Sequence, residues 1–273
     1  MKKLFKKKTT IIAMTLLVLF IVMSIVGPLV LKGNPYTQDL NNKFASVSFK
    51  NWLGTDELGR DTFTRLVYGS RISLGIAFVG VLLGSLIGIT LGVIAGYYGG
   101  VADILISRLL DIILAFPGIL IAILIVAVLG VGTVNTTIAV AIFIIPSMAR
   151  VVRGSVLKIG SEEFIQASKA FGIKSPIIIL KHILPNVAPI IIVNVTLDLG
   201  AAILTASSLS FLGLGVQAPH PEWGAILSQM RQVIRVYPLG VIAPGLMITL
   251  VVLSFSLMGD ALRDALDPKI ESI

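Results

Sequence analysis

The chain has 273 residues, of which 56% are hydrophobic and 13% are charged, and its mean hydropathy is +0.98. A soluble domain carries about 25% charged residues, so this composition excludes an ordinary soluble globular protein and indicates a polytopic membrane protein. The net charge of +8 is interpreted as a marker of loop orientation rather than of nucleic-acid binding, because no basic and aromatic patch lies in a soluble segment. Cysteine is absent, which excludes disulfides and thiolate metal sites.

Six stretches are long and apolar enough to cross a bilayer, which takes about 20 residues. Each is expected to be a helix, because unpaired backbone groups are not tolerated in lipid. The expected spans cover about 9–31, 72–97, 104–129, 134–157, 177–207 and 239–262. The predicted fold class is therefore an all-α polytopic membrane helix bundle with six transmembrane helices.

These spans divide the chain into four parts. They are an N-terminal tail with an uncleaved anchor, an outer loop, a transmembrane domain with a long inner loop, and a short C-terminal tail, at residues 1–31, 32–71, 72–268 (inner loop 158–185) and 269–273. In the outer loop, Arg60 and Arg65 with apolar neighbours at 63, 66 and 67 predict an amphipathic helix on the membrane surface.

Charge sets the expected orientation. Most of the 22 lysines and arginines fall on or beside the segments that six crossings place on the same side as the N-terminus. The positive-inside rule therefore predicts a multi-pass protein of the inner or plasma membrane with both termini and the inner loop in the cytoplasm. In the third span, Asp111 is expected to form a local ion pair with Arg108.

A glycine repeat marks the second span. Five glycines recur at every fourth position, at Gly80, Gly84, Gly88, Gly92 and Gly96. Small residues at this spacing let a neighbouring helix approach closely, so a packing role is favoured over a role in substrate binding. Prolines inside three other spans, at Pro117, Pro146 and Pro244, predict kinks.

The fifth span carries a polar stripe formed by Asn194, Asp198, Ala201 and Thr205. Two interpretations stay open: the stripe lines a translocation path, or it forms a buried hydrogen bond to a neighbouring span. Beyond it, the Leu209–Trp223 stretch is expected to fold back into the membrane mouth or to receive an extracellular partner. A lone His220 within it is taken as a loop residue, so no metal site and no catalytic residue is predicted.

The inner loop contains a short polar helix. Ser161 is expected to be its N-cap, Glu162 and Glu163 lie in its first turn, and Gly172 ends it. Ser175 followed by Pro176 then predicts the cap and first residue of the next helix. One face is apolar (Phe164, Ala167, Ala170, Phe171) and the other polar (Glu162, Gln166, Lys169). Such a helix either rests on lipid headgroups or receives a soluble partner.

A family resemblance favours the second alternative. The residues Gln166, Ala167, Ser168 and Gly172, followed by a Leu-Pro pair at 184–185, resemble the EAA loop of importer-type ABC permeases. Gln166 stands where that family has Glu, and His182 stands where isoleucine is usual. Together with five further stretches, the chain resembles the second permease subunit of dipeptide, oligopeptide and nickel uptake systems. These stretches are Trp52–Asp61, Gly96–Gly100, Leu209–Gln217, Pro221–Gly224 and Gly259–Pro268.

The resemblance implies a type I importer-like bundle whose short inner helix is the coupling helix. The residues expected to meet the ATPase are Glu162, Glu163, Phe164, Gln166, Ala167, Ser168, Ala170, Phe171 and Gly172. The implied partners are a homologous second permease subunit, two ATP-binding cassette subunits and an extracellular binding protein. The sequence holds no phosphate-binding G-x-x-x-x-G-K-[ST] loop, so ATP and Mg²⁺ are expected on the partner ATPase. The alternative is a self-contained channel or secondary carrier.

Overall fold

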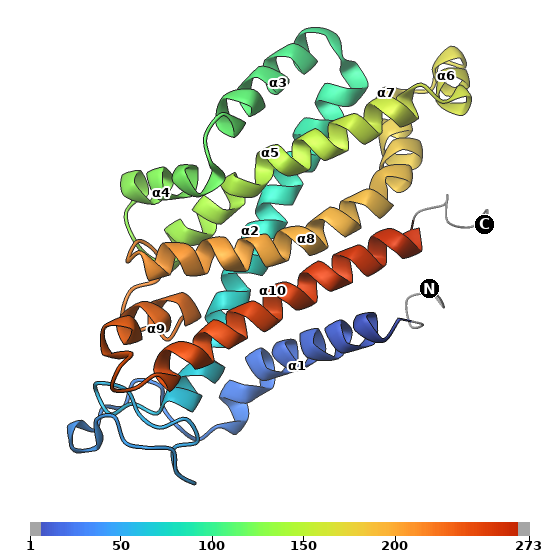
Figure 1. Ribbon diagram of the computed structural model, residues 1–273. Helices are drawn as coiled ribbons and strands as arrows, with labels where there is room; N and C mark the ends of the chain where they lie inside the picture. The colour runs from blue at the N-terminus through green and yellow to red at the C-terminus, as the bar shows by residue number, and fades with distance from the viewer. Residues whose placement is uncertain (1–6, 267–273) are drawn as a thin grey trace.

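The computed structural model describes residues 7–266, so the expected tail at 269–273 lies outside the described part. Helices account for nearly all of this part, and a single isolated bridge joins Thr55 to Asp61. The helices, shown in Figure 1, are α1 (Lys8–Val30), α2 (Thr62–Tyr98), α3 (Gly100–Leu114), α4 (Gly118–Leu129), α5 (Thr133–Gly160), α6 (Glu163–Ala170), α7 (Ser175–Ile178), α8 (Leu184–Phe211), α9 (Trp223–Met230) and α10 (Leu239–Leu266). The predicted all-α class is confirmed.

Five helices among residues 7–266 are long and apolar enough to cross a membrane. They are α1, α2, α5, α10 and the continuous run Ser175–Phe211, in which a π-helical turn joins α7 to α8. Five of the six expected spans are thereby found, with shifted boundaries. The number rises to six when α3 and α4 are counted together as one broken span.

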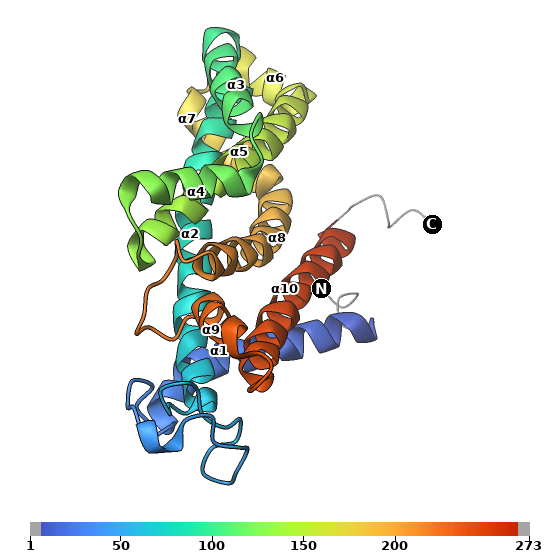
Figure 2. The same ribbon diagram turned by 60° about the vertical axis from the view of Figure 1, so that its left-hand side comes forward.

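The third expected span, with its predicted kink at Pro117, is broken into two helices. The helices α3 and α4 meet at an angle of 90° (Figure 2). Pro117 lies at the break and is the N-cap of α4. Proline carries no N–H group and disfavours a helical conformation in the residue before it, so the chain ends one helix and begins another instead of bending within one.

The expected membrane-surface helix near residues 60–67 is wrong. These residues lead directly into α2, whose first turn is capped by Asp61 accepting a hydrogen bond from the Thr64 amide at 2.7 Å. Arg60 and Arg65 are buried in protein and do not face headgroups. At about 1.5 Å per residue, the 37 residues of α2 span about 55 Å, well beyond the about 30 Å of hydrocarbon.

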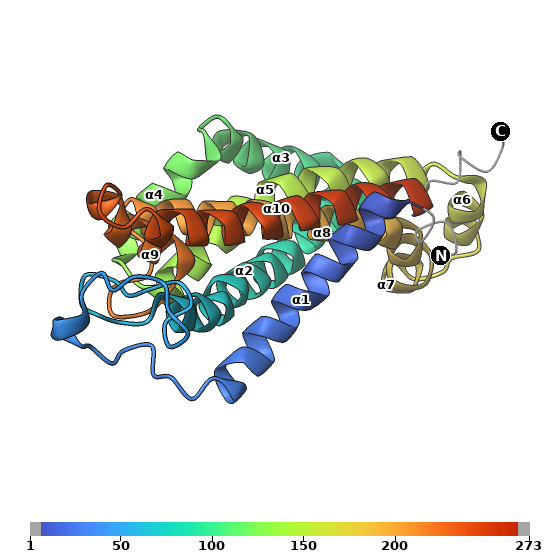
Figure 3. The same cartoon turned by 60° about the horizontal axis from the view of Figure 1, so that its bottom comes forward.

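The long helices run back and forth between two ends of the bundle. One end, here called the α6 end, carries α6, the start of α1 and the end of α10 (Figures 1 and 3). Lys7 and Asp264 form an ion pair of 2.7 Å there, which ties the first helix to the last. The opposite end, here called the α9 end, carries α9 and the loop between α1 and α2.

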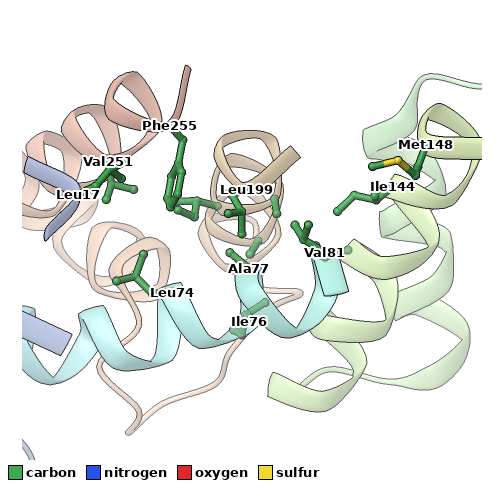
Figure 4. Packing of buried hydrophobic residues seen from close by; sticks show 14 of the residues in the cluster. Leu17, Leu74, Ile76, Ala77, Val81, Ile144, Met148, Leu199, Val251 and Phe255 are labelled. Carbon is green, nitrogen blue, oxygen red and sulfur yellow. The ribbon is translucent and has the colours of Figure 1, made fainter. Parts of the chain in front are cut away.

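The core gathers around α2. Figure 4 shows side chains of four helices packed together: Leu74, Ala77 and Val81 of α2, Ile144 and Met148 of α5, Leu199 of α8, and Val251 and Phe255 of α10. These residues are buried, and α2 contacts α5 along much of its length. The resulting unit of α2 and α5 is the structural centre of the chain.

Candidate functional site

The inner-loop helix α6 is shorter than expected and begins later. Glu162, with extended backbone, is its N-cap, so α6 runs for 8 residues from Glu163. Ser161 is not the N-cap, because its backbone is still helical and its hydroxyl donates to the carbonyl of Lys158 at 2.8 Å, closing α5. The second cap is shifted by one residue as well: Lys174 is the N-cap of α7, and Ser175 is its first residue.

Gly172 ends α6 as expected. Its φ of +70° is left-handed, and its amide donates to the carbonyl of Lys169 at 3.0 Å. Glycine adopts this conformation without the penalty that a Cβ would add.

Three contacts hold α6 to the bundle. Ile165, which the sequence analysis did not single out, is fully buried. The side-chain amide of Gln166 donates to the carbonyl of Gly160 at 2.7 Å, a bond that a carboxylate at this position could not donate. The Lys169 ammonium lies 5.2 Å from the centroid of the Tyr97 ring, at the end of α2.

The rest of α6 faces outward. Phe171 is 86% exposed and Phe164 is 45% exposed, with the Phe164 ring edge-on to His182 at 6.5 Å. Most of the other candidate residues are exposed too (Glu162, Glu163, Gln166, Ala167, Ala170, Gly172), whereas Ser168 is half-buried and donates to the carbonyl of Phe164. A rigid short helix thus presents two aromatic rings beyond the end of the bundle, which suits a protein partner with apolar pockets.

The five glycines of α2 all lie against α5. A Cβ built on Gly84 would lie 2.5 Å from the carbonyl oxygen of Ala141, and one on Gly92 would lie 2.6 Å from that of Ala149. Gly80, Gly88 and Gly96 are equally close to Val140, Met148 and Val156. This face of α2 is covered by another helix and therefore packs instead of lining a path.

The residues of the polar stripe on α8 differ in their surroundings. Thr205 is buried, and the Asn194 side-chain amide donates within its own helix, to the carbonyl of Ile190 at 2.8 Å. Among the described residues, the Asp198 Oδ2 atom is buried and has no hydrogen-bond partner. This oxygen therefore does not form the hydrogen bond to a neighbouring span that the second interpretation of the stripe requires.

Two polar clusters at the α9 end were missed by sequence reasoning. In the first, the fully buried Glu222 caps α9 by accepting from the Ala225 amide at 2.8 Å, and it also accepts from the Ser73 hydroxyl at 3.0 Å. Trp223 is fully buried as well and donates from its indole nitrogen to the carbonyl of Leu66 at 2.9 Å. The Leu209–Trp223 stretch thus packs its tryptophan inward and does not offer it to a partner.

In the second cluster, Asp56 lies buried between two arginines. Its Oδ2 is 2.6 Å from Arg60 Nε and 3.5 Å from Arg65 Nε. Arg65 also donates to the carbonyl of Pro35 at 3.1 Å. The cluster joins the α1–α2 loop to α2, so these charges position this loop.

The ion pairs at the α6 end differ from those expected. Asp111 pairs with Arg150 of α5 at 2.9 Å and not with Arg108. Asp103 accepts two hydrogen bonds from Arg153. Both acidic residues of α3 therefore face α5. His220 meets the hydroxyl of Tyr36 at 3.2 Å, and within residues 7–266 no group of three potential metal ligands comes together.

Burial raises the pKa of the Glu222 carboxyl, and this predicts a pH-dependent stability. A raised pKa means that the folded protein holds the proton more tightly than the unfolded chain, so the stabilisation present at low pH is lost as the pH rises through the raised pKa. We expect Glu222→Gln to remove this dependence while keeping an acceptor for Ser73. Glu222→Ala should also lose this pH dependence, and it should cost about 1–3 kcal/mol at low pH, where the wild-type stabilisation is present, because Ser73 and the first turn of α9 lose their acceptor. Thermal unfolding of the purified protein from pH 5 to 9 would test both, and a parallel pH dependence in wild type and Glu222→Gln would contradict the assignment.

Two family models match this chain. The first, described as binding-protein-dependent transport system inner membrane component, matches residues 88–272. The second, described as the N-terminal TM domain of oligopeptide transport permease C, matches residues 1–46. Together they cover the anchor helix and most of the bundle.

Curated relatives are similar over most of the chain. The dipeptide transport system permease protein DppC of Alkalihalophilus pseudofirmus is 50% identical over 271 residues, which is 99% of this chain and 89% of that protein. The glutathione transport system permease protein GsiD of Pectobacterium atrosepticum is 49% identical over 225 residues, 82% of this chain and 75% of that protein. A solved structure of the MetNI methionine ABC transporter shares the fold, with a TM-score of 0.62 at 21% identity, covering 75% of this chain and 97% of that one.

Proposed function

This chain belongs to the family of binding-protein-dependent transport system inner membrane components, and from that membership we propose that it is one transmembrane half of an ATP-driven importer of small peptides. The observation that carries the proposal is α6, a short helix fixed to the bundle by Ile165 and exposing Phe164 and Phe171 at one end. Such a helix can receive movement from a soluble subunit and pass it to α2 and α5, against which it is anchored.

Peptides are the proposed cargo because both relatives are named for them, one for dipeptides and one for glutathione. The expectation of nickel or metal chelates, which came from the wider resemblance, has no counterpart in these names. The polar stripe of Asn194, Asp198 and Thr205 is the proposed contact with the translocation path. Its support is the unpaired Asp198 oxygen, which is costly in a membrane unless it meets protein, water or cargo.

The proposed assembly contains a homologous second permease, two ATP-binding cassette subunits and an extracellular binding protein. The α6 end, with the start of α1 and the end of α10, lies in the cytoplasm of the cell that holds this membrane protein, and the α9 end lies outside. ATP and Mg²⁺ bind to the cassette subunits in this scheme. The clustering of lysines near the start of the chain supports the orientation.

Reconstitution tests the proposal against a self-contained carrier. The two permeases, the cassette subunits and the binding protein would be placed in proteoliposomes, and uptake of a labelled dipeptide followed. We expect uptake only with hydrolysable ATP, and none when the phosphate-binding lysine of the cassette subunits is replaced. Uptake that persists without the cassette subunits and follows an imposed proton or sodium gradient would show a secondary carrier instead.

A further inference from the structure

We propose that a cavity at the α9 end, here called the headgroup cavity, binds the headgroup of a phospholipid that carries a primary ammonium group, such as phosphatidylethanolamine. The cavity has a volume of about 520 Å³ and lies between the α1–α2 loop and the first turn of α2. Two carboxylates, one ammonium and two aromatic rings line it, from Asp39, Asp61, Lys50, Trp52 and Phe63. The inference concerns the chain and its membrane, and it does not depend on the proposed import of peptides.

The end of α1 sets the depth of the cavity in the membrane. At about 1.5 Å per residue, the 23 residues of α1 are about 35 Å long, close to the about 30 Å of hydrocarbon. The sequence has no charged residue between Lys8 and Lys32, so these two lysines bracket a single crossing. Leu31, Gly33 and Asn34 directly follow α1 and line the cavity. The headgroup cavity therefore lies at the depth of the phospholipid headgroups.

The start of α2 lies at the same depth. The Tyr68 hydroxyl donates to the carbonyl of Pro28 at 3.1 Å, which joins α2 to the last turns of α1. A Cβ built on Gly33 would lie 2.9 Å from the hydroxyl oxygen of Thr64. These contacts hold Phe63 and Thr64, which line the cavity from α2, beside the outer end of α1.

Exposed aromatic rings are explained by the same depth. Figure 3 shows the α1–α2 loop beyond the end of α1. On this loop Phe49 is fully exposed and Trp52 is 61% exposed. Tryptophan is enriched at both membrane–water interfaces, where its ring sits at the level of the headgroups. Phospholipids at this level therefore cover these two rings.

The two carboxylates are placed to receive an ammonium group. Asp61 accepts a hydrogen bond from the Thr64 amide at 2.7 Å. Asp39 accepts from the Asn41 amide at 3.2 Å and from the Asn42 side-chain amide at 2.6 Å. An ionised carboxylate has about four acceptor positions, so both can accept further hydrogen bonds. A primary ammonium group carries N–H donors that suit two such acceptors.

The rest of the lining matches a zwitterion. The ring centroids of Trp52 and Phe63 are 4.9 Å apart, and aromatic faces attract cations. Lys50 lines the same cavity and suits a phosphate group. Phosphatidylethanolamine carries an ammonium and a phosphate joined by an ethylene linker. Phosphatidylglycerol lacks the ammonium, and phosphatidylcholine lacks its N–H donors, so the cavity should distinguish the three lipids.

The fold of the loop holds the cavity in shape. Gly59 has a left-handed φ of +71°, and a Cβ built on it would lie 1.8 Å from the carbonyl oxygen of Asp39. The Asp39 amide donates to the carbonyl of Leu58 at 3.1 Å. Farther along the loop, the Ala45 amide donates to the Thr55 hydroxyl at 2.8 Å. A preorganised site loses less conformational entropy when its ligand binds.

The test is native mass spectrometry of the full-length protein in detergent, mixed with equal amounts of phosphatidylethanolamine and phosphatidylglycerol. We expect the wild type to retain phosphatidylethanolamine in preference, with phosphatidylcholine between the two in a second mixture. Asp39→Asn/Asp61→Asn should weaken retention of phosphatidylethanolamine about tenfold or more, because bonds between charged groups are lost. Asparagine also caps helices well, so α2 should keep its first turn. The control is Asp260→Asn, which removes an exposed carboxylate of α10 at the α6 end and should keep the wild-type preference.

Three results would overturn the proposal. The first is equal retention of phosphatidylethanolamine and phosphatidylglycerol by the wild type, and the second is unchanged retention by the double variant. The third is displacement of phosphatidylethanolamine by millimolar alanyl-alanine with the dipeptide found bound, which would assign the cavity to a peptide. If the double variant aggregates during size exclusion, Trp52→Ser takes its place, since this exposed ring caps no helix. Wild-type retention by Trp52→Ser would then contradict the proposal.

Discussion

Replacing Gly88 with leucine is expected to prevent α2 from packing on α5 and to abolish recovery of the folded protein. A Cβ at this position would already lie 2.8 Å from the Cβ of Met148 and 2.9 Å from the carbonyl oxygen of Ile145. The Met148 Cβ and the Ile145 carbonyl are held by the backbone of α5 and cannot rotate out of the way, so the two helices must separate. The cost should exceed the about 1–3 kcal/mol typical of overpacking a core.

Gly75 provides a matched control on the same helix, because a Cβ there meets nothing within 4 Å. Gly75→Leu should leave yield and size-exclusion profile close to wild type, and Gly88→Ala should fall between the two. The measurement is the fraction of membrane-extracted protein that remains monodisperse, followed by its thermal unfolding. Equal yields for Gly75→Leu and Gly88→Leu would contradict the packing role of the glycine face.

Removing both aromatic rings of α6 is expected to disconnect transport from ATP hydrolysis. Phe164 and Phe171 are exposed, so Phe164→Ser/Phe171→Ser should fold and insert normally. The cassette subunits would lose two apolar contacts, and truncating central interface aromatics weakens binding by about tenfold or more. ATP-dependent dipeptide uptake in proteoliposomes should fall about tenfold or more, in line with the weaker binding. The amount of cassette subunit that co-purifies with the permease should fall as well.

Tyr98 supplies the control for this experiment, since it is another exposed ring at the α6 end. Tyr98→Ser should retain uptake if only the α6 rings engage the partner. Normal uptake by the α6 double variant, with normal recovery of the cassette subunits, would mean that movement enters the bundle by another route.

Sequence alone predicted the elements whose signal is local. The apolar lengths located five spans, because lipid requires continuous apolar helices of that size. The four-residue glycine spacing identified a close-approach face, and Gly172 identified the end of α6. Each of these depends on neighbouring positions on one helix.

The features that sequence reasoning missed depend on distant parts of the chain. The sequence predicts a kink at Pro117, whereas in the structure Pro117 is the N-cap of a new helix. Whether a proline bends a helix or starts a new one depends on the surrounding helices. The two tryptophans were not distinguishable by composition, and the structure buries Trp223 while exposing Trp52. Arg65 looked like a headgroup contact, but its partners come from residues 56 and 35 through loop folding.

The most direct test of whether α6 lies in the cytoplasm is to label a single introduced cysteine, because the sequence contains no natural cysteine. A single Phe171→Cys, at the most exposed ring of α6, would be treated with a membrane-impermeant maleimide in intact spheroplasts and in inside-out vesicles. We predict labelling in the vesicles alone, together with a crosslink to the cassette subunit that ATP binding alters. Labelling of Phe171→Cys in intact spheroplasts would place α6 outside the cell and contradict the proposal that the work of ATP hydrolysis enters this protein through it.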